Sequence, residues 1–94
     1  MSVYFIANIE IRDEMEYQKY LARVDGVFAQ FEGKYLAVDL NPEVLEGTWD
    51  YSRVVLIEFP DRSALLRWYR SEAYQEILKF RLRGARCDSV VIEG

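Results

Sequence analysis

One stretch of the sequence places an arginine where a helix is expected to carry an apolar side chain. Residues 68–81 read WYRSEAYQEILKFR, and four of them follow the i, i+3, i+4, i+7 spacing of one helix face: Tyr74, Ile77, Leu78 and Arg81. A guanidinium on the inward side of a helix can bind a carboxylate or an enolate through two parallel hydrogen bonds. Arg81 is therefore the first candidate for binding a small anionic ligand.

The alternative role for Arg81 is an ion pair inside the protein. Three carboxylates are available elsewhere in the chain: Asp13, Glu46 and Glu58. Such a pair would hold the helix against a sheet, and removing one partner of a buried pair costs about 3–5 kcal/mol. Both roles stay open, and they can coexist if the carboxylate also faces a pocket.

Three neighbours of Arg81 carry side chains that can contact the same ligand. Tyr74 can donate a proton or a hydrogen bond to a ligand oxygen, Ser71 can help to orient it, and Trp68 can supply an aromatic wall. The structural alternative is that Trp68 and Tyr74 belong to the core. Ser71 would then cap a helix, which contributes about 1 kcal/mol.

Carboxylates within strand-like segments form a second group of candidates. Glu58 alternates with Val54 and Leu56 on one strand face, and Glu10 occupies a similar position in the first strand-like segment. A desolvated carboxylate has a raised pKa, which suits a general base. Alternatively, both side chains reach water at the ends of their strands. Glu58 is retained as a candidate ligand-binding residue.

Composition narrows the possible functions. With 94 residues, the chain is expected to form a single domain, residues 1–94. Acidic and basic residues are interspersed and the net charge is −4, which argues against nucleic acid and against an anionic membrane surface as partners. No stretch approaches the roughly 20 apolar residues of a membrane span. The chain has no histidine, which excludes the common zinc and haem sites and serine–histidine catalysis, so we expect no cofactor.

The expected location is the cytoplasm. The single cysteine, Cys87, cannot form an internal disulfide, which fits a reducing compartment. The first residues run directly into a strand-like segment, without the basic region and cleavage site of a signal peptide.

Alternation and turn signals predict strands at residues 3–11, 34–39, 53–59 and 87–93. The first helix starts at an Asp13 cap, carries an apolar stripe as far as Phe31 and ends before Gly33, the expected left-handed residue after the helix. The second helix starts after Asp61, is interrupted near Ser71 and stops at Gly84.

The order βαββαβ predicts an α+β sandwich with a four-stranded antiparallel sheet and all helices on one face. The first and third strands are the most apolar, which places them in the centre. The other sheet face would then expose several apolar side chains to water: Tyr4, Ile6, Val54 and Leu56. We therefore expect a homodimer through this open face. The loop at residues 46–49 either covers a pocket or crosses to the second protomer.

Several segments together resemble a known family. They are YFIANIEIRD, the Tyr17 and Tyr20 pair, LEGTWD, RVVLIEFPD, and WYRSEAYQ with the later arginine. The chain resembles the domain-of-unknown-function family numbered 1330, of the dimeric α+β barrel superfamily. The resemblance implies a ferredoxin-like protomer whose open sheet face packs against a second copy to close a barrel. Trp68, Ser71 and Tyr74 match a W-x-x-S-x-x-Y run of that family.

The resemblance carries no shared activity, because one fold supports many functions. The histidines used by haem-binding and several oxygenase relatives have no counterpart in this chain. The leading hypothesis is a small-molecule-binding protein, acting without a cofactor on a small anionic or carbonyl compound if it is catalytic. The alternative is a non-catalytic structural or regulatory dimer in which Arg81 forms an internal ion pair.

Overall fold

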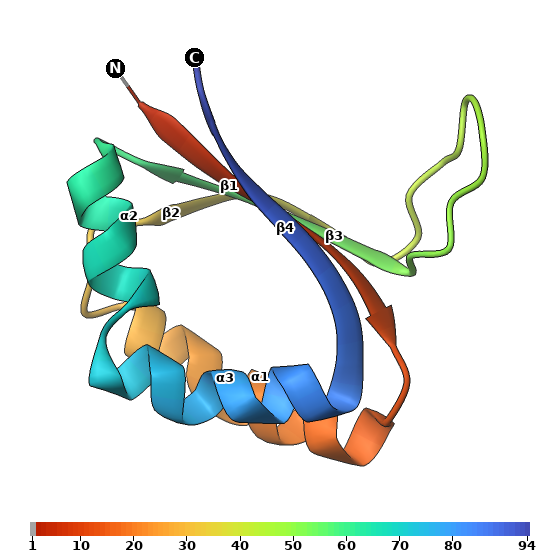
Figure 1. Ribbon diagram of the computed structural model, residues 1–94, viewed down its shortest axis with the longest axis horizontal. Helices are drawn as coiled ribbons and strands as arrows, with labels where there is room; N and C mark the ends of the chain where they lie inside the picture. Colours follow the sequence, from red (N-terminus) through yellow and green to blue (C-terminus); the bar gives the residue numbers. More distant parts are fainter. Residues whose placement is uncertain (1) are drawn as a thin grey trace.

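The computed structural model describes residues 2–94, which form a four-stranded antiparallel sheet with three helices on one face (Figure 1). The elements are β1 (Val3–Ile11), α1 (Glu14–Phe28), β2 (Lys34–Asp39), β3 (Arg53–Phe59), α2 (Arg62–Tyr69), α3 (Glu72–Gly84) and β4 (Ala85–Glu93). The sheet order is β2-β3-β1-β4, so β1 and β3 are central. The predicted α+β sandwich is confirmed.

The core lies between the sheet and the helices. Every second residue of the central strands is buried against the helix layer, as the alternation predicts: Val3, Phe5, Ala7 and Ile9 in β1, and Val55, Ile57 and Phe59 in β3. Trp68 of α2 is in contact with the rings of Phe5, Phe28 and Phe59. This aromatic cluster fixes α2 against one end of the sheet.

The helices begin at the predicted caps. The Asp13 carboxylate accepts a hydrogen bond from the Glu16 backbone N–H at 3.3 Å, and Asp61 accepts one from Ala64 at 2.8 Å. Ser71 Oγ accepts one from the Tyr74 N–H at 3.1 Å, which starts α3 directly after α2. Each side chain satisfies one of the backbone donors left free at a helix start.

The prediction for the end of α1 was wrong. The helix stops at Phe28, and a tighter turn follows in which Phe31 N–H donates to the Phe28 carbonyl at 3.0 Å. Gly33 does not have the predicted left-handed backbone, since within residues 2–94 only Gly47 has a positive φ. Its role is close packing, because a Cβ there would lie 2.5 Å from the Phe28 ring.

β4 starts at Ala85, two residues earlier than predicted. Ala85 already pairs with Ile11, so the strand follows α3 without a loop. The reason is the close approach of α3 to α1: the Gly84 carbonyl accepts hydrogen bonds from the N–H groups of Arg12 and Asp13 at 2.8 and 2.9 Å. These bonds place the chain at the sheet edge as soon as the helix ends.

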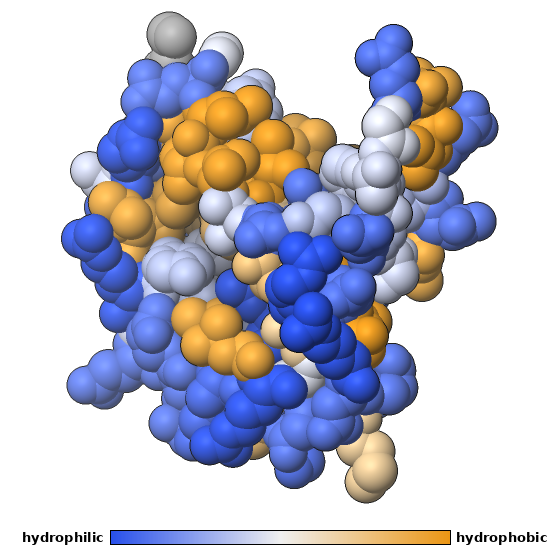
Figure 2. All heavy atoms as spheres, turned by 45° about the vertical axis from the view of Figure 1, so that its right-hand side comes forward, coloured by the Kyte–Doolittle hydropathy of each residue, from blue (hydrophilic) through white to orange (hydrophobic). Residues whose placement is uncertain are grey.

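The segment between β2 and β3, residues 40–52, projects from the end of the sheet as a long loop, which we call the β2–β3 arm (Figure 1). It exposes apolar side chains, and Leu45 is 85% exposed. Figure 2 shows this apolar surface on the arm, and a second apolar region beside the chain termini.

Among the described residues, no helix covers the outward face of the sheet, which we call the open face. The strand register places apolar side chains of the three strands β1, β3 and β4 next to one another on it: Tyr4, Ile6, Val54, Leu56, Val90 and Ile92. They are partly or largely exposed. Within residues 2–94, no helix has both the length and the apolar character needed to cross a membrane.

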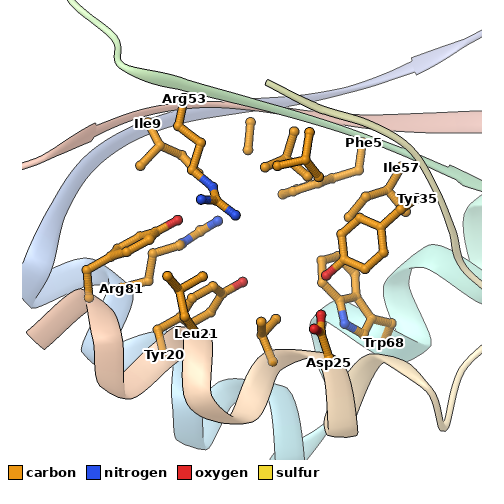
Figure 3. Close-up of a pocket in the computed structure, with 15 residues that line it drawn as sticks. Phe5, Ile9, Tyr20, Leu21, Asp25, Tyr35, Arg53, Ile57, Trp68 and Arg81 are labelled. Carbon is orange, nitrogen blue, oxygen red and sulfur yellow. The ribbon is translucent and has the colours of Figure 1, made fainter. Parts of the chain in front are cut away.

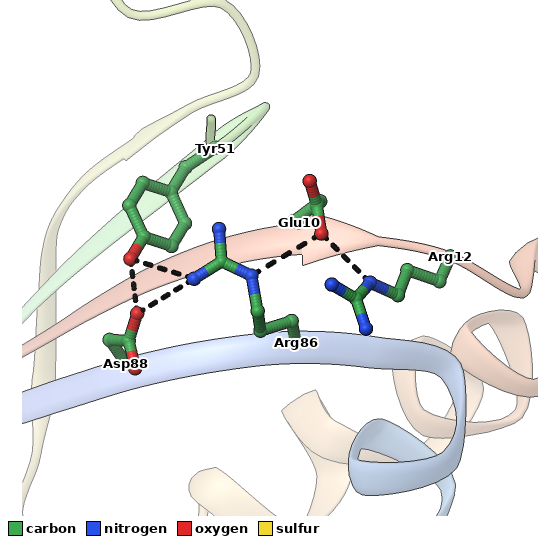
Figure 4. A network of polar contacts seen from close by, with 5 residues as sticks. All are labelled: Glu10, Arg12, Tyr51, Arg86 and Asp88. Carbon is green, nitrogen blue, oxygen red and sulfur yellow. Dashed lines mark hydrogen bonds and ion pairs between the residues drawn. The ribbon is translucent and has the colours of Figure 1, made fainter. Parts of the chain in front are cut away.

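A polar network anchors the base of the arm to the open face (Figure 4). Arg86 of β4 donates to Tyr51 and Asp88, both at 3.1 Å, and to Glu10 at 3.3 Å. The Tyr51 hydroxyl also donates to Asp88, and Arg12 donates to Glu10 at 2.8 Å. The hydrogen bond from Arg12 is the main cause that lowers the pKa of Glu10; partial burial opposes the shift, and the hydrogen bond from Arg86 lowers the pKa further.

Candidate functional site

A cavity of about 410 Å³ lies between the sheet and helix α1 (Figure 3). Its volume falls in the range of small-molecule pockets, about 300–1,000 Å³. The two ends differ in chemistry. Arg53 and Arg81 lie at one end, while Phe5, Tyr35 and Trp68 form an aromatic wall at the other.

Arg81 projects into this cavity from α3 and is only 3% exposed. Its Nε has no hydrogen-bond partner, and its guanidinium carbon lies 5.9 Å from the centre of the Tyr20 ring. Burial acts to lower the pKa of this guanidinium, but the neighbouring Tyr74 and Tyr20 raise it and the net shift is upward. Arg81 is therefore a buried cation at neutral pH.

The predicted internal partners of Arg81 lie elsewhere. Within residues 2–94, no carboxylate forms an ion pair with it. Asp13 caps α1, and Glu46 borders a separate hollow on the β2–β3 arm. Glu58 pairs with Tyr4 and lies on the open face, so the sheet separates it from the cavity. The ion-pair interpretation of Arg81 is therefore wrong for this structure.

Arg53 is the second cation of the cavity, and the sequence analysis did not single it out. It begins β3 and shares the inward face with Val55 and Ile57, and its buried Nε also has no partner. Figure 3 shows Arg53 reaching down from the sheet and Arg81 reaching up from the helix layer toward the same end of the cavity. The sequence pattern could have identified Arg53, because it continues the apolar face of a strand in the same way that Arg81 continues the apolar face of a helix.

A pair of tyrosines lies beside the arginines. The hydroxyls of Tyr20 and Tyr74 are 2.9 Å apart and hydrogen-bonded. Tyr20 lines the cavity, whereas Tyr74 is fully buried behind it. Burial is the main cause that raises the pKa of both phenols, so both are neutral donors at neutral pH. Tyr74 therefore positions Tyr20 and does not itself face the cavity.

The other predicted residues are divided between the cavity and the frame around it. Trp68 lines the cavity, and its buried Nε1 has no hydrogen-bond partner. Ser71 does not line it, because its hydroxyl donates to the Trp68 carbonyl at 2.8 Å and caps α3. The structure thus places Arg81 and Trp68 at opposite ends of one cavity and keeps Tyr74 and Ser71 in the supporting layer. Glu58 lies on the opposite face of the sheet.

The carboxylate of this cavity belongs to Asp25 of α1, at the aromatic end and away from the arginines (Figure 3). It is exposed, and Tyr35 beside it is 37% exposed. Partial burial, followed by the charge of Asp25, raises the pKa of Tyr35 to about 12. These two residues lie where the cavity meets the exposed edge strand β2.

The fold and the cavity define a ferredoxin-like α+β protein with a small-molecule-sized space between sheet and helices. The chain belongs to the family described as domain of unknown function DUF1330, whose sequence model matches residues 2–94. Among curated proteins, none matches this chain.

Solved structures with the same fold share little sequence with the chain. A protein of unknown function from Rhodopseudomonas palustris superposes with a TM-score of 0.81 at 19% identity, covering 99% of this chain and 82% of that one. A dimeric ferredoxin-like protein of unknown function from Jannaschia sp. CCS1 gives 0.79 at 17% identity, covering all of both chains. SnoaB, a cofactor-independent oxygenase from Streptomyces nogalater, gives 0.73 at 17% identity, covering 99% of this chain and 92% of its own.

Proposed function

We propose that this protein binds a small anionic molecule in the cavity between sheet and helices, with Arg81 and Arg53 as the anion-binding residues. The observation that carries the proposal is that two guanidinium groups line one end of a cavity while their buried Nε atoms have no partner. Buried charges are ordinarily paired with an opposite charge. An anionic ligand would supply the missing partner and the missing acceptors.

Trp68 and Tyr20 support the same proposal. The unpartnered Nε1 of Trp68 can donate to a ligand oxygen, and the Tyr20 hydroxyl is held in place by Tyr74. Ser71 contributes indirectly by fixing the start of α3, from which Tyr74 and Arg81 project. Glu58 has no part in this site.

A cofactor-free enzyme acting on a carbonyl compound is the second candidate function. Two guanidiniums that face a carbonyl oxygen would stabilise the enolate formed when a neighbouring carbon loses a proton. The carboxylate among the described lining residues, Asp25, lies exposed at the end away from the arginines, so it is not placed to accept that proton and the base would have to come from water or from the ligand. SnoaB, described as a cofactor-independent oxygenase, has this fold, which by itself assigns no reaction.

We also propose that two copies associate through the open face. Tyr4, Ile6 and Leu56 form a contiguous apolar surface there, and the protein from Jannaschia sp. CCS1 with this fold is described as dimeric. The β2–β3 arm, which exposes Leu45 and Trp49, would extend this contact. We also propose a cytoplasmic location, because the single Cys87 fits a reducing compartment.

The binding proposal is tested by thermal-shift screening of small carboxylates and enolisable carbonyl compounds. We expect ligands that stabilise the wild type and the Arg83→Met variant to leave Arg81→Met unchanged. Arg83 is the matched control because it lies exposed on the same helix. Equal shifts in all three proteins would remove Arg81 from the site.

The association is tested separately by light scattering. We expect the mass of two chains for the wild type and of one chain for Leu56→Lys, because a lysine in the middle of the open face opposes its burial. A wild type with the mass of one chain at micromolar concentration would contradict the dimer.

A further inference from the structure

We propose that the ligand of this cavity carries two negative charges at one end of a planar, apolar body, either on two neighbouring carboxylates or on one phosphate-type group. This inference rests on the proposed anion-binding function and specifies the class of ligand. It follows from three features of the cavity: the number of its cations, their position at one end, and the aromatic character of the other end.

The charge count comes first. Arg53 and Arg81 both remain protonated at neutral pH, because a guanidinium does not lose its proton in proteins. Within residues 2–94, neither forms an ion pair with a carboxylate. Asp25 lies at the opposite end of the cavity (Figure 3). A ligand with one negative charge would therefore leave one of the two guanidiniums, the buried Arg81 or the partly buried Arg53, without an opposite charge.

The position of the two cations determines how the ligand charges are arranged. Arg53 approaches from the sheet and Arg81 from the helix layer, and both point toward one end of the cavity (Figure 3). Each guanidinium forms its strongest hydrogen bonds with a planar pair of anionic oxygens or with phosphate-type oxygens. Two carboxylates on adjacent carbons, or one phosphonate or phosphate group, present such oxygens in opposite directions. Two charges at opposite ends of a long molecule would not fit, since the far end contains Asp25.

The remaining space determines the body of the ligand. Phe5, Trp68 and Tyr35 present aromatic rings at the far end. Aromatic side chains favour offset or edge contacts with another ring. A cavity of about 410 Å³ is near the lower end of the range for small-molecule sites, so a single ring with its substituents is the fitting size. The unpartnered Trp68 Nε1 can donate to an oxygen on that ring.

The test compares probes that differ in one property at a time. Benzoate has the ring and one charge, phthalate has the ring and two adjacent carboxylates, and phenylphosphonate at pH 8 has the ring and a phosphonate dianion. Maleate has two adjacent carboxylates without a ring. Dissociation constants are measured by titration calorimetry for the wild type, Arg53→Gln, Arg53→Lys and the exposed control Arg83→Gln, each checked for native circular dichroism.

We expect the wild type and Arg83→Gln to bind phthalate or phenylphosphonate about ten- to a hundredfold more tightly than benzoate, since a charge-assisted hydrogen bond contributes a factor of this order. Which dianion is preferred distinguishes a dicarboxylate from a phosphate-type ligand. Arg53→Gln should lose the preference for dianions, because it should weaken the binding of phthalate and phenylphosphonate about ten- to a hundredfold more than that of benzoate. Arg53→Lys should retain part of the preference. Maleate should bind more weakly than phthalate.

Equal affinity for benzoate and for both dianions would overturn the inference and leave the anion-binding function in place. An unchanged preference for dianions in Arg53→Gln would also overturn it, because the second charge would then have another partner. Binding of maleate as tight as that of phthalate would contradict the apolar body. If none of the four probes binds, the proposed function itself fails, together with the inference.

Discussion

At the scale of single residues, the unusual feature is a cation that folding must bury without a partner. Desolvating an isolated charge is costly, and replacing buried ionic groups by apolar ones of similar size is often neutral or stabilises a protein by about 1–4 kcal/mol. Arg81 is buried, and within residues 2–94 it has no carboxylate partner. Its position therefore makes the unliganded protein less stable than an apolar residue there would.

We predict that Arg81→Met raises the free energy of unfolding by about 1–3 kcal/mol in the absence of ligand. Methionine keeps most of the buried aliphatic length and removes the charge. Urea unfolding monitored by circular dichroism measures the change, with Arg83→Met as a surface control expected to stay within about 0.5 kcal/mol of the wild type. A loss of stability in Arg81→Met would show that the guanidinium has a structural role.

The buried tyrosine pair makes a prediction about alkaline pH. Burial raises the pKa of Tyr20 and of Tyr74 in the folded protein, whereas an unfolded tyrosine titrates near pH 10. The folded state thus retains protons that the unfolded state loses. The stability from these groups is fully present below pH 10 and decreases as the pH rises above it.

Tyr20→Phe should therefore lower the free energy of unfolding by about 1 kcal/mol at pH 7, because the hydrogen bond between the two hydroxyls is lost. Between pH 9 and pH 11 the free energy of unfolding of this variant should decrease less than that of the wild type. Urea titrations at these three pH values measure both effects. Tyr4→Phe on the open face serves as the control. Parallel declines in the wild type and Tyr20→Phe would mean that the alkaline loss comes from other groups.

Candidate residues could be predicted where a polar residue occupies a position that the periodicity of a helix or strand assigns to its apolar face. Arg81 stood out because three apolar residues precede it on the same helix face. Arg53 follows the same logic, but it is the first residue of a strand, where a polar side chain is ordinary. That Ser71 caps a helix and that Tyr74 lies behind Tyr20 depend on contacts between segments far apart in sequence, which periodicity does not contain.

At the scale of elements, the cavity is the space that remains after α1 and α3 have packed on each other and on the sheet. Strand bounds followed from alternation, and three of the four strands have the predicted ends. The end of α1 and the start of β4 did not follow from the sequence pattern, because both depend on where the helices contact other parts of the chain. The existence of the cavity could not be predicted for the same reason.

Gly84 controls how closely α3 approaches α1. A Cβ at this position would lie 2.6 Å from the backbone nitrogen of Tyr17 and 3.0 Å from the Asp13 carbonyl oxygen. We predict that Gly84→Ala lowers the free energy of unfolding by about 1–3 kcal/mol, because backbone atoms cannot move aside as a flexible side chain can.

Gly26→Ala in the last turn of α1 is the matched control for this prediction. A Cβ there has nothing within 4 Å, so alanine should stabilise the protein by about 0.5–1 kcal/mol through its higher helix propensity. Urea unfolding of both variants measures the two changes. Equal effects of the two alanines would refute the packing role of Gly84.

At the scale of the whole molecule, the sheet has one face against its own helices and one face open. The alternating pattern of β1 and β3 predicted both faces, including the apolar side chains on the outer one. In the proposed dimer a second copy of the chain covers that face, so the sequence pattern of a single chain does not describe this contact.

If two chains fold and associate together, stability depends on protein concentration. We predict that the midpoint of thermal unfolding rises by about 3 °C for each tenfold increase in concentration, since a tenfold change corresponds to about 1.4 kcal/mol per dimer. Scanning calorimetry or circular dichroism over two decades of concentration measures it. The Leu56→Lys variant should show a midpoint that does not change with concentration, and the same flat response in the wild type would count against coupled folding and association.

The sheet is only one peptide layer thick, and Arg53 and Val54 are consecutive residues that face its two sides. Whatever binds the guanidinium and whatever covers the valine therefore act on the same stretch of backbone. Thermodynamic linkage requires the influence to be mutual: if filling the cavity strengthens subunit contact by some factor, subunit contact strengthens ligand affinity by the same factor. Strand β3 would transmit this coupling between ligand binding and subunit association.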